Sequence, residues 1–214
     1  MKAAAINRYG SADVIEFAEV PKPTIKPNQL LLKVHYASIN PVDWKMRNGR
    51  FKLILGNKFP KVLGLECAGE VVEIGKNITK FKVGDRIIGS SFPGCYAEFT
   101  AVNENKAVKI PDSLSYADAS TIPVACMTAY FSLFDLGKLN KGDKVLLNGA
   151  SGGVGLFAVQ IAHIIGADIT AVCSEKNFNL VKSFGDNIRL VDYHKTDVTK
   201  ENIQYKVVFD IVNS

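Results

Sequence analysis

The chain has 214 residues, of which 47% are hydrophobic and 22% charged, and its formal net charge is +5. This balance is typical of a globular protein with one large or two small domains, and it excludes a disordered or fibrous chain. No apolar run approaches the roughly 18 residues that a membrane-spanning helix needs. The basic residues are scattered along the chain, so we expect neither a membrane protein nor a nucleic-acid binder. The four cysteines form no CxxC pair, which argues against a zinc ribbon or disulfide scaffold and favours a cytoplasmic protein with reduced thiols.

The first half of the chain has the pattern of a β domain. From residue 1 to about 112, short apolar runs alternate with proline and glycine. Strands are predicted over 30–36 (LLLKVHY), 69–74 (GEVVEI) and 85–88 (DRII). The proline-rich stretch 21–27 predicts an exposed extended link, because proline cannot donate to a strand ladder. Together these runs predict an all-β, partly barrel-like domain.

After Pro111 the pattern changes to alternating helices and strands. Ser113 is predicted to cap a helix that ends at Ser120, and a second helix is predicted over 127–136. Apolar strands are predicted over 144–148 (KVLLN), 169–173, 188–191 and 207–212, and the apolar run 154–165, which ends before Gly166, is long enough to favour a helix. This alternation predicts right-handed βαβ units and a parallel sheet.

A glycine loop over 149–155 (GASGGVG) lies between the first of these strands and the long helix. Its last six residues match the G-x-G-x-x-G fingerprint with alanine in place of the first glycine. Gly152 would let the backbone approach a pyrophosphate, and Gly155 would let the helix pack closely on the strand. The free N–H groups of Gly153 and Val154, at the start of the helix, would face the phosphate charge. The loop predicts dinucleotide binding, and the alternative is a tight turn without a ligand.

The residue that closes the second strand distinguishes NAD(H) from NADP(H). An NAD site places a carboxylate there, about 20 residues after the loop, to bind the ribose 2′-hydroxyl. Here Ser174 stands at that point and Lys176 follows. A hydroxyl with a nearby ammonium would accept a 2′-phosphate that a carboxylate would repel, so the pattern favours NADP(H). Glu175 is the competing residue if the strand is one position longer.

Several segments, taken in order, carry a family resemblance. They are 37–47 (ASINPVDWKMR), 62–72 (VLGLECAGEVV), 82–89 (KVGDRIIG), 94–99 (GCYAEF), 128–130 (TAY), the glycine loop and 191–193 (VDY). This series resembles the medium-chain dehydrogenase/reductase superfamily, and specifically its zinc-free NADPH:quinone oxidoreductase (zeta-crystallin-like) branch. The resemblance implies an α/β fold, with a GroES-like, partly open β-barrel catalytic domain over 1–118. A Rossmann domain, a doubly wound parallel sheet that binds NADP(H), would follow over 119–214.

That Rossmann domain is expected to be incomplete. Four strands are predicted, whereas a complete doubly wound domain has about six. The family usually continues past 209–214 with further nicotinamide contacts, the rest of the sheet and a dimer edge. The chain is therefore expected to be C-terminally truncated as a fragment, a natural short form or an inactive relic. An uncovered strand over 207–212 would favour a homodimer.

The resemblance also implies that zinc is absent. Zinc-dependent members hold the catalytic metal with two Cys and one His, and the corresponding positions here are Asn40, Leu65 and Val124. Leucine and valine have no donor atom, and an amide is a poor zinc ligand. The structural zinc lobe needs four clustered Cys, and only Cys95 falls in that region. We expect neither zinc.

Without a Lewis acid, the chemistry suited to such a site is hydride transfer from NADPH to an electron-poor small molecule, such as a quinone or an α,β-unsaturated carbonyl. The catalytic candidates implied by the resemblance are Asn40 and Thr128 near the nicotinamide and Asp43 on the substrate side. Cofactor-binding candidates are Ser151, Gly152, Gly153 and Val154 for the pyrophosphate, and Ser174, Lys176 and Tyr193 for the adenosine ribose and its phosphate. The second hypothesis is a nucleotide-binding relative without turnover.

Each catalytic candidate has a structural alternative. Asn40 precedes Pro41 and could cap a turn, and Asp43 could cap a short helix over 44–47. Thr128 could be a helix residue that bonds to a backbone carbonyl. Glu66 lies in an apolar segment, and we expect it to pair with a buried partner and not to act as a base.

Overall fold

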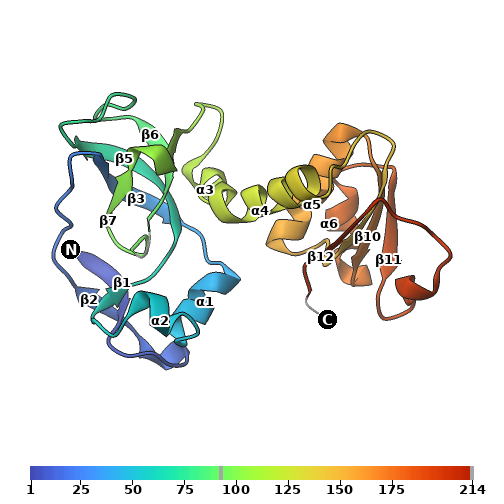
Figure 1. The fold of residues 1–214 in the computed structure, drawn as a ribbon, viewed down its shortest axis with the longest axis horizontal. Coiled ribbons are helices and arrows are strands. Elements are labelled where there is room, and N and C mark those ends of the chain that lie inside the picture. Colours follow the sequence, from blue (N-terminus) through green and yellow to red (C-terminus); the bar gives the residue numbers. More distant parts are fainter. Residues whose placement is uncertain (92–93, 213–214) are drawn as a thin grey trace. The chain divides into compact units, whose positions relative to one another are not determined.

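The computed structural model describes residues 1–91 and 94–212, and the chain divides into two compact units. The first unit is Met1–Val124 and the second is Ala125–Ser214 (Figure 1). None of the helices in the described residues is both long and apolar enough to cross a lipid bilayer.

The first unit is built from two antiparallel sheets. One has the order β2 (Ile15–Glu19), β1 (Lys2–Ile6), β4 (Lys61–Val62). The other has the order β7 (Phe99–Asn103), β3 (Gln29–Ala37), β5 (Glu66–Ile74), β6 (Arg86–Ser90), β8 (Ala107–Lys109). An antiparallel bridge pairs Ala3 of β1 with Ala97, just before β7, and the two sheets form a partly open barrel as predicted.

The barrel core gathers buried side chains from β3 and β5. Leu30, Leu32 and Val71 are fully buried against one another. Gly69 on β5 is required by the close crossing of these strands, because a Cβ there would lie 2.2 Å from the carbonyl oxygen of Lys33. These strands confirm the predicted runs, with ends that move by a few residues.

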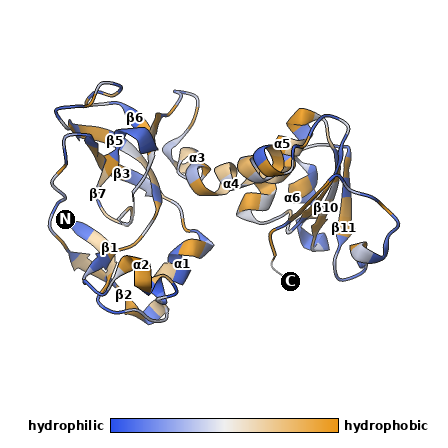
Figure 2. Ribbon diagram, in the orientation of Figure 1, coloured by the Kyte–Doolittle hydropathy of each residue, from blue (hydrophilic) through white to orange (hydrophobic). Residues whose placement is uncertain are grey.

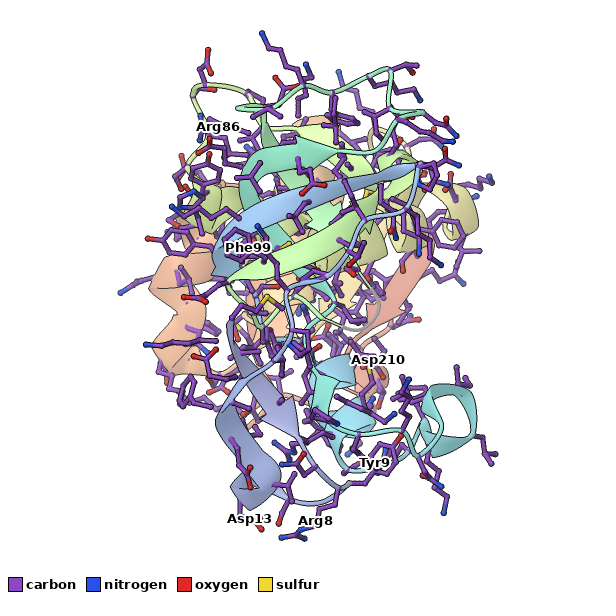
Figure 3. All side chains as sticks on the ribbon, turned by 90° about the vertical axis from the view of Figure 1, so that its left-hand side faces the viewer. Arg8, Tyr9, Asp13, Arg86, Phe99 and Asp210 are labelled. Carbon is purple, nitrogen blue, oxygen red and sulfur yellow. The ribbon has the colours of Figure 1, made fainter. Side chains whose placement is uncertain are left out.

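Short helices lie between and after the strands of the first unit. They are α1 (Pro41–Arg47), α2 (Lys52–Leu55) and α3 (Tyr116–Ala119), with 3-10 turns η1 (Ala12–Val14) and η2 (Glu104–Lys106) and a π-helical segment η3 (Ile122–Cys126). The prediction that Ser113 caps a helix is wrong. Ser115 is the N-cap of α3, because its Oγ accepts the Asp118 N–H at 3.1 Å. At η1 an exposed ion pair joins Arg8 to Asp13 at 3.4 Å (Figure 3).

The second unit is a parallel four-stranded sheet with helices. Its strands are β9 (Lys144–Asn148), β10 (Asp168–Cys173), β11 (Ile188–Asp192) and β12 (Val207–Asp210). Their spatial order is β11-β10-β9-β12, which is the 3-2-1-4 part of a doubly wound sheet. The helices are α4 (Met127–Tyr130), the π-helical η4 (Phe131–Leu136), α5 (Gly153–Ile165) and α6 (Phe178–Lys182), with 3-10 turns η5 (Glu175–Asn177) and η6 (Val198–Lys200). All four predicted strands are confirmed, although β12 ends at Asp210.

Helix α5 contributes one apolar face to the core of this unit. Its buried residues Ala158, Val159 and Ala162 pack with the apolar side chains of β9 and β10, and α5 is predominantly orange in Figure 2. Gly166 caps the end of the helix. Its left-handed backbone (φ 81°) lets its N–H donate to carbonyl oxygens of the last turn. The predicted helix over 154–165 is therefore confirmed, and this packing places the glycine loop at the carboxyl end of β9.

Candidate functional site

A pocket of about 870 Å³ lies at the carboxyl ends of β9 and β10. In doubly wound folds, ligands bind at this edge of the sheet, beside the point where the strand order reverses. Here the order reverses between β9 and β12. The lining includes Gly149, Ser151 and Gly152 of the glycine loop, Ser174, Lys176 and Asn177 beyond β10, Tyr193 beyond β11, and Ile211 and Val212 beyond β12.

The glycine loop leaves open backbone at the start of α5. A Cβ added to Gly153 would meet no atom within 4 Å, and one on Gly152 would meet only the Gly149 carbonyl oxygen, at 3.4 Å. A negatively charged group can therefore approach the first N–H groups of this 13-residue helix, where the helix dipole is positive. Gly155 differs, because a Cβ there would lie 2.2 Å from the Gly149 oxygen. The loop fits a pyrophosphate.

The other end of the pocket has the polar groups expected for an adenosine ribose. Ser174, Lys176 and Tyr193 all line it, so the residues predicted from the ends of two strands share one cavity with the glycine loop. Glu175 lines a separate pocket of about 250 Å³, and its carboxylate pairs with Lys195 at 2.5 Å. Ser174 and Lys176 therefore line the cavity, whereas the competing carboxylate of Glu175 pairs with Lys195.

Sequence reasoning missed Asn177. This residue precedes α6, and its Nδ2 donates to Ser151 Oγ at 3.0 Å and to Ser174 Oγ at 3.2 Å. The amide thus connects the glycine loop to the end of β10. An Asn directly before a helix is a recognisable cap signal, but its contact with a loop 26 residues away depends on the tertiary fold.

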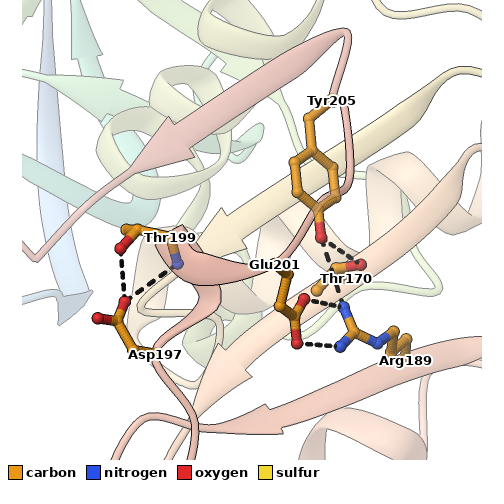
Figure 4. A network of polar contacts seen from close by, with 6 residues as sticks. All are labelled: Thr170, Arg189, Asp197, Thr199, Glu201 and Tyr205. Carbon is orange, nitrogen blue, oxygen red and sulfur yellow. Dashed lines mark hydrogen bonds and ion pairs between the residues drawn. The ribbon is translucent and has the colours of Figure 1, made fainter.

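The segment that follows β11 in the chain closes one side of the pocket, and a polar network holds it in place (Figure 4). Arg189 on β11 binds both carboxylate oxygens of Glu201, at 2.5 and 2.8 Å. Tyr205 donates to Thr170 Oγ1 at 3.2 Å, and the Asp197 carboxylate accepts from the N–H and Oγ1 of Thr199. Since 196–199 line the pocket, these contacts fix one of its walls.

In the first unit, Asn40 and Asp43 lie together at the start of α1. Helix α1 begins at Pro41 with Asn40 as its N-cap, so the helix is longer than the alternative of 44–47, but Asp43 does cap it as part of a capping box. Asp43 is the third helical residue, and its Oδ2 accepts the Asn40 N–H at 2.7 Å. Its other oxygen, Oδ1, is buried without a hydrogen-bond partner in the described residues. Burial raises the pKa of Asp43, against the opposing hydrogen bond from Asn40.

Glu66 is the centre of a buried polar cluster. Its Oε1 accepts from the Ser38 hydroxyl and from Asn40 Nδ2 (2.6 Å), and its Oε2 accepts the Val124 N–H at 2.5 Å. The side chain is completely buried, which confirms that it pairs with buried partners. Burial raises the pKa of Glu66, although all three hydrogen bonds favour the carboxylate. Asn40 Nδ2 donates its second hydrogen to Ser38 Oγ at 3.1 Å.

Thr128 lies exposed on α4 of the second unit, a helix that packs against α5. The catalytic roles of Asn40, Asp43 and Thr128 remain predictions. Across residues 1–91 and 94–212, no group of three His, Cys, Asp or Glu side chains is arranged to hold a metal ion.

Comparison with known proteins gives a consistent family. The model for the alcohol dehydrogenase GroES-like domain matches residues 26–112. The chloroplast envelope quinone oxidoreductase homolog of Arabidopsis thaliana is 39% identical over 202 residues, which cover 90% of this chain and 61% of the plant protein. The 2-methylene-furan-3-one reductase of Solanum lycopersicum is 36% identical, over 99% of this chain and 57% of the tomato protein. The chain thus spans about three fifths of the length of these relatives.

Solved structures agree. The quinone oxidoreductase from Coxiella burnetii superposes with a TM-score of 0.93 at 32% identity, over 100% of this chain and 69% of that one. Mycobacterial Rv1454c, solved in complex with NADPH, gives a TM-score of 0.81 at 28% identity, over 90% and 59%. A GroES-like barrel followed by a parallel, doubly wound sheet defines a medium-chain dehydrogenase/reductase. Within that superfamily, the chain belongs to the quinone oxidoreductase family.

Proposed function

We propose that this chain is a zinc-independent reductase that binds NADPH and passes hydride to a quinone or an α,β-unsaturated carbonyl. The observation that carries the proposal is the pocket at the ends of β9 and β10. It combines an open glycine loop with Ser174 and Lys176 at the point where an NAD site has a carboxylate. The NADPH in Rv1454c, the quinone oxidoreductase names of other relatives and the enone reductase name of the tomato protein support it.

The chain's own residues would bind the cofactor and orient it. The N–H groups at Gly153 and Val154 and the Ser151 hydroxyl would hold the pyrophosphate, while Lys176 would neutralise the 2′-phosphate. Tyr193, 56% exposed at the pocket, would contact the ribose end. When bound, NADPH supplies the hydride.

At the nicotinamide end we assign Asn40 the role of an acceptor. Both of its Nδ2 hydrogens are donated within the chain, to Glu66 and Ser38. Its Oδ1 has two lone pairs, so it can accept from a carboxamide or a hydroxyl in addition to the Asp43 N–H of the capping box. We also assign catalytic roles to Asp43 in the first unit and to Thr128 in the second, and water would supply the proton. Because the acceptor is already electron-poor, no Lewis acid is needed, and Asn40, Leu65 and Val124 do not form a zinc ligand set.

We also propose that the 214-residue chain forms a homodimer through β12. Within the described residues β12 pairs only with β9, and an unpaired strand edge favours pairing with a second copy. Sedimentation equilibrium at several concentrations tests this, and a monomer at all of them would exclude it. The cytoplasmic location stays a prediction.

Fluorescence titration with NADPH and with NADH, followed by NADPH consumption with a simple quinone, tests the function. We expect saturable binding that is tighter for NADPH, and consumption that depends on the quinone. Saturable binding without consumption would select the alternative, a nucleotide-binding relative without turnover. A folded chain that binds neither cofactor would refute both. Tighter binding of NADH would overturn the assignment of Ser174 and Lys176, and one tightly held zinc per chain would overturn zinc independence.

A further inference from the structure

Asn177 joins two serines that belong to different ends of the cofactor pocket. Ser151 is part of the glycine loop and Ser174 follows β10, and both line the cavity. The Asn177 Nδ2 lies 3.0 Å from the first hydroxyl oxygen and 3.2 Å from the second. All three side chains are partly buried. One amide nitrogen therefore bridges the loop that would hold the pyrophosphate and the site that would hold the ribose.

This arrangement sets the direction of both hydroxyl groups. An amide nitrogen can only donate, so each serine oxygen accepts from Asn177 and keeps its own O–H hydrogen for another acceptor. In the described part of the chain, no protein acceptor takes either hydrogen. Both hydroxyls are thus left as donors at the surface of the pocket. A phosphate oxygen is an acceptor only, and it is the partner that two such donors suit best.

We propose that Asn177 is a positioning residue that favours the phosphorylated cofactor by holding the Ser151 and Ser174 hydroxyls as donors. The proposal rests on the proposed function, namely that the pocket binds NADPH. The ribose 2′-hydroxyl of NADH both donates and accepts, so it tolerates a reversed Ser174 hydroxyl, whereas a 2′-phosphate does not. Loss of Asn177 should therefore affect NADPH more than NADH.

The test is fluorescence titration of wild type and variants with both reduced cofactors. Asn177→Ala removes the bridge and lets the hydroxyls rotate. Asn177→Asp keeps the volume but replaces the donor with an acceptor, so that the hydroxyl hydrogens turn away from the pocket. We expect the Kd for NADPH to rise about tenfold in Asn177→Ala and further in Asn177→Asp, with a smaller change for NADH. Ser174→Ala completes a double-mutant cycle, in which the effect of Asn177→Ala should shrink.

Asn179→Asp is the matched control for added charge, because Asn179 is exposed on α6, two positions further along, and does not line the pocket. The proposal is overturned if Asn177→Ala leaves NADPH affinity unchanged, if both cofactors weaken equally, or if Asn177→Asp and Asn179→Asp weaken NADPH equally. Thermal unfolding establishes that each variant is folded. If Asn177→Ala is unfolded, the comparison of the two aspartate variants decides. A wild-type chain that does not bind NADPH overturns the proposed function itself, whereas wild-type binding with unchanged variants overturns this inference alone.

Discussion

Among single residues, Glu66 has the most demanding environment. Its two carboxylate oxygens accept from a hydroxyl, an amide and a backbone N–H, and every partner is a donor. Only a carboxylate offers acceptors on both sides, so a glutamine in its place would turn an NH₂ group toward another donor. The burial that raises the pKa of Glu66 makes this side chain costly to charge, and the three donors offset that cost.

We expect Glu66→Gln to lower the free energy of unfolding of the first unit by about 2 kcal/mol, because a buried donor loses its acceptor. Urea unfolding followed by the fluorescence of Trp44, the single tryptophan of the chain, measures this in the first unit. Glu73→Gln is the matched control on the same strand, since Glu73 is exposed. Equal stability of the Glu66 and Glu73 variants would contradict the role of Glu66 as an acceptor of three hydrogen bonds.

At the scale of elements, the turn from β9 into α5 assigns different tasks to its glycines. Gly155 lies where the helix crosses the loop. A Cβ added to it would lie 2.2 Å from the carbonyl oxygen of Gly149, a backbone atom that has little room to move. Gly153 faces open space at the helix start. Gly155 is therefore needed for packing, and Gly153 is free to contact a ligand.

A pair of alanine substitutions separates these tasks. Gly155→Ala should destabilise the second unit by about 2 kcal/mol, because the backbone must shift to admit a methyl group. Gly153→Ala should leave stability unchanged or raise it by a few tenths of a kcal/mol, since alanine favours a helix, yet weaken NADPH binding about tenfold by filling the approach to the N–H groups. Thermal unfolding by circular dichroism and NADPH titration measure the two effects. Unchanged NADPH affinity in a folded Gly153→Ala variant would show that the phosphate does not approach this backbone.

At the scale of the whole molecule, the buried acids make stability depend on pH. Burial raises the pKa of Asp43 above its ordinary value of 3.8, so the folded chain holds this proton more tightly than the unfolded chain does. Between the ordinary pKa and the raised one, the unfolded state therefore binds fewer protons than the folded state does. As pH rises through this window, the free energy of unfolding falls. Glu66, whose pKa is also raised, adds a fall of the same sign.

Asp43→Asn removes one of these titrations while it keeps an oxygen that can accept the Asn40 N–H. We expect the variant to gain stability relative to wild type as pH rises above about 4, where the Asp43 carboxyl begins to lose its proton in the unfolded chain. Urea unfolding from pH 4 to pH 8, followed by Trp44 fluorescence, measures the difference at each pH. A constant difference across this range would show that Asp43 does not titrate differently in the two states.

The sequence by itself was sufficient for the features that depend on neighbours along the chain. The four parallel strands, helix α5 and the glycine loop follow from apolar periodicity and glycine spacing, which act within a few residues. The local caps were less certain, as Ser113 and the start of α1 show, because several nearby polar residues compete for the same helix end.

Only the tertiary structure decided which polar atoms meet. Glu66 takes its donors from residues 26 and 58 positions away, and Asn177 reaches a serine 26 positions away. The pairing of Glu175 with Lys195, 20 positions later, likewise depends on two strand ends lying side by side. Such contacts form because the order of strands in the sheet brings together segments that are far apart in the sequence. The pattern of neighbouring residues does not reveal which distant segments will meet.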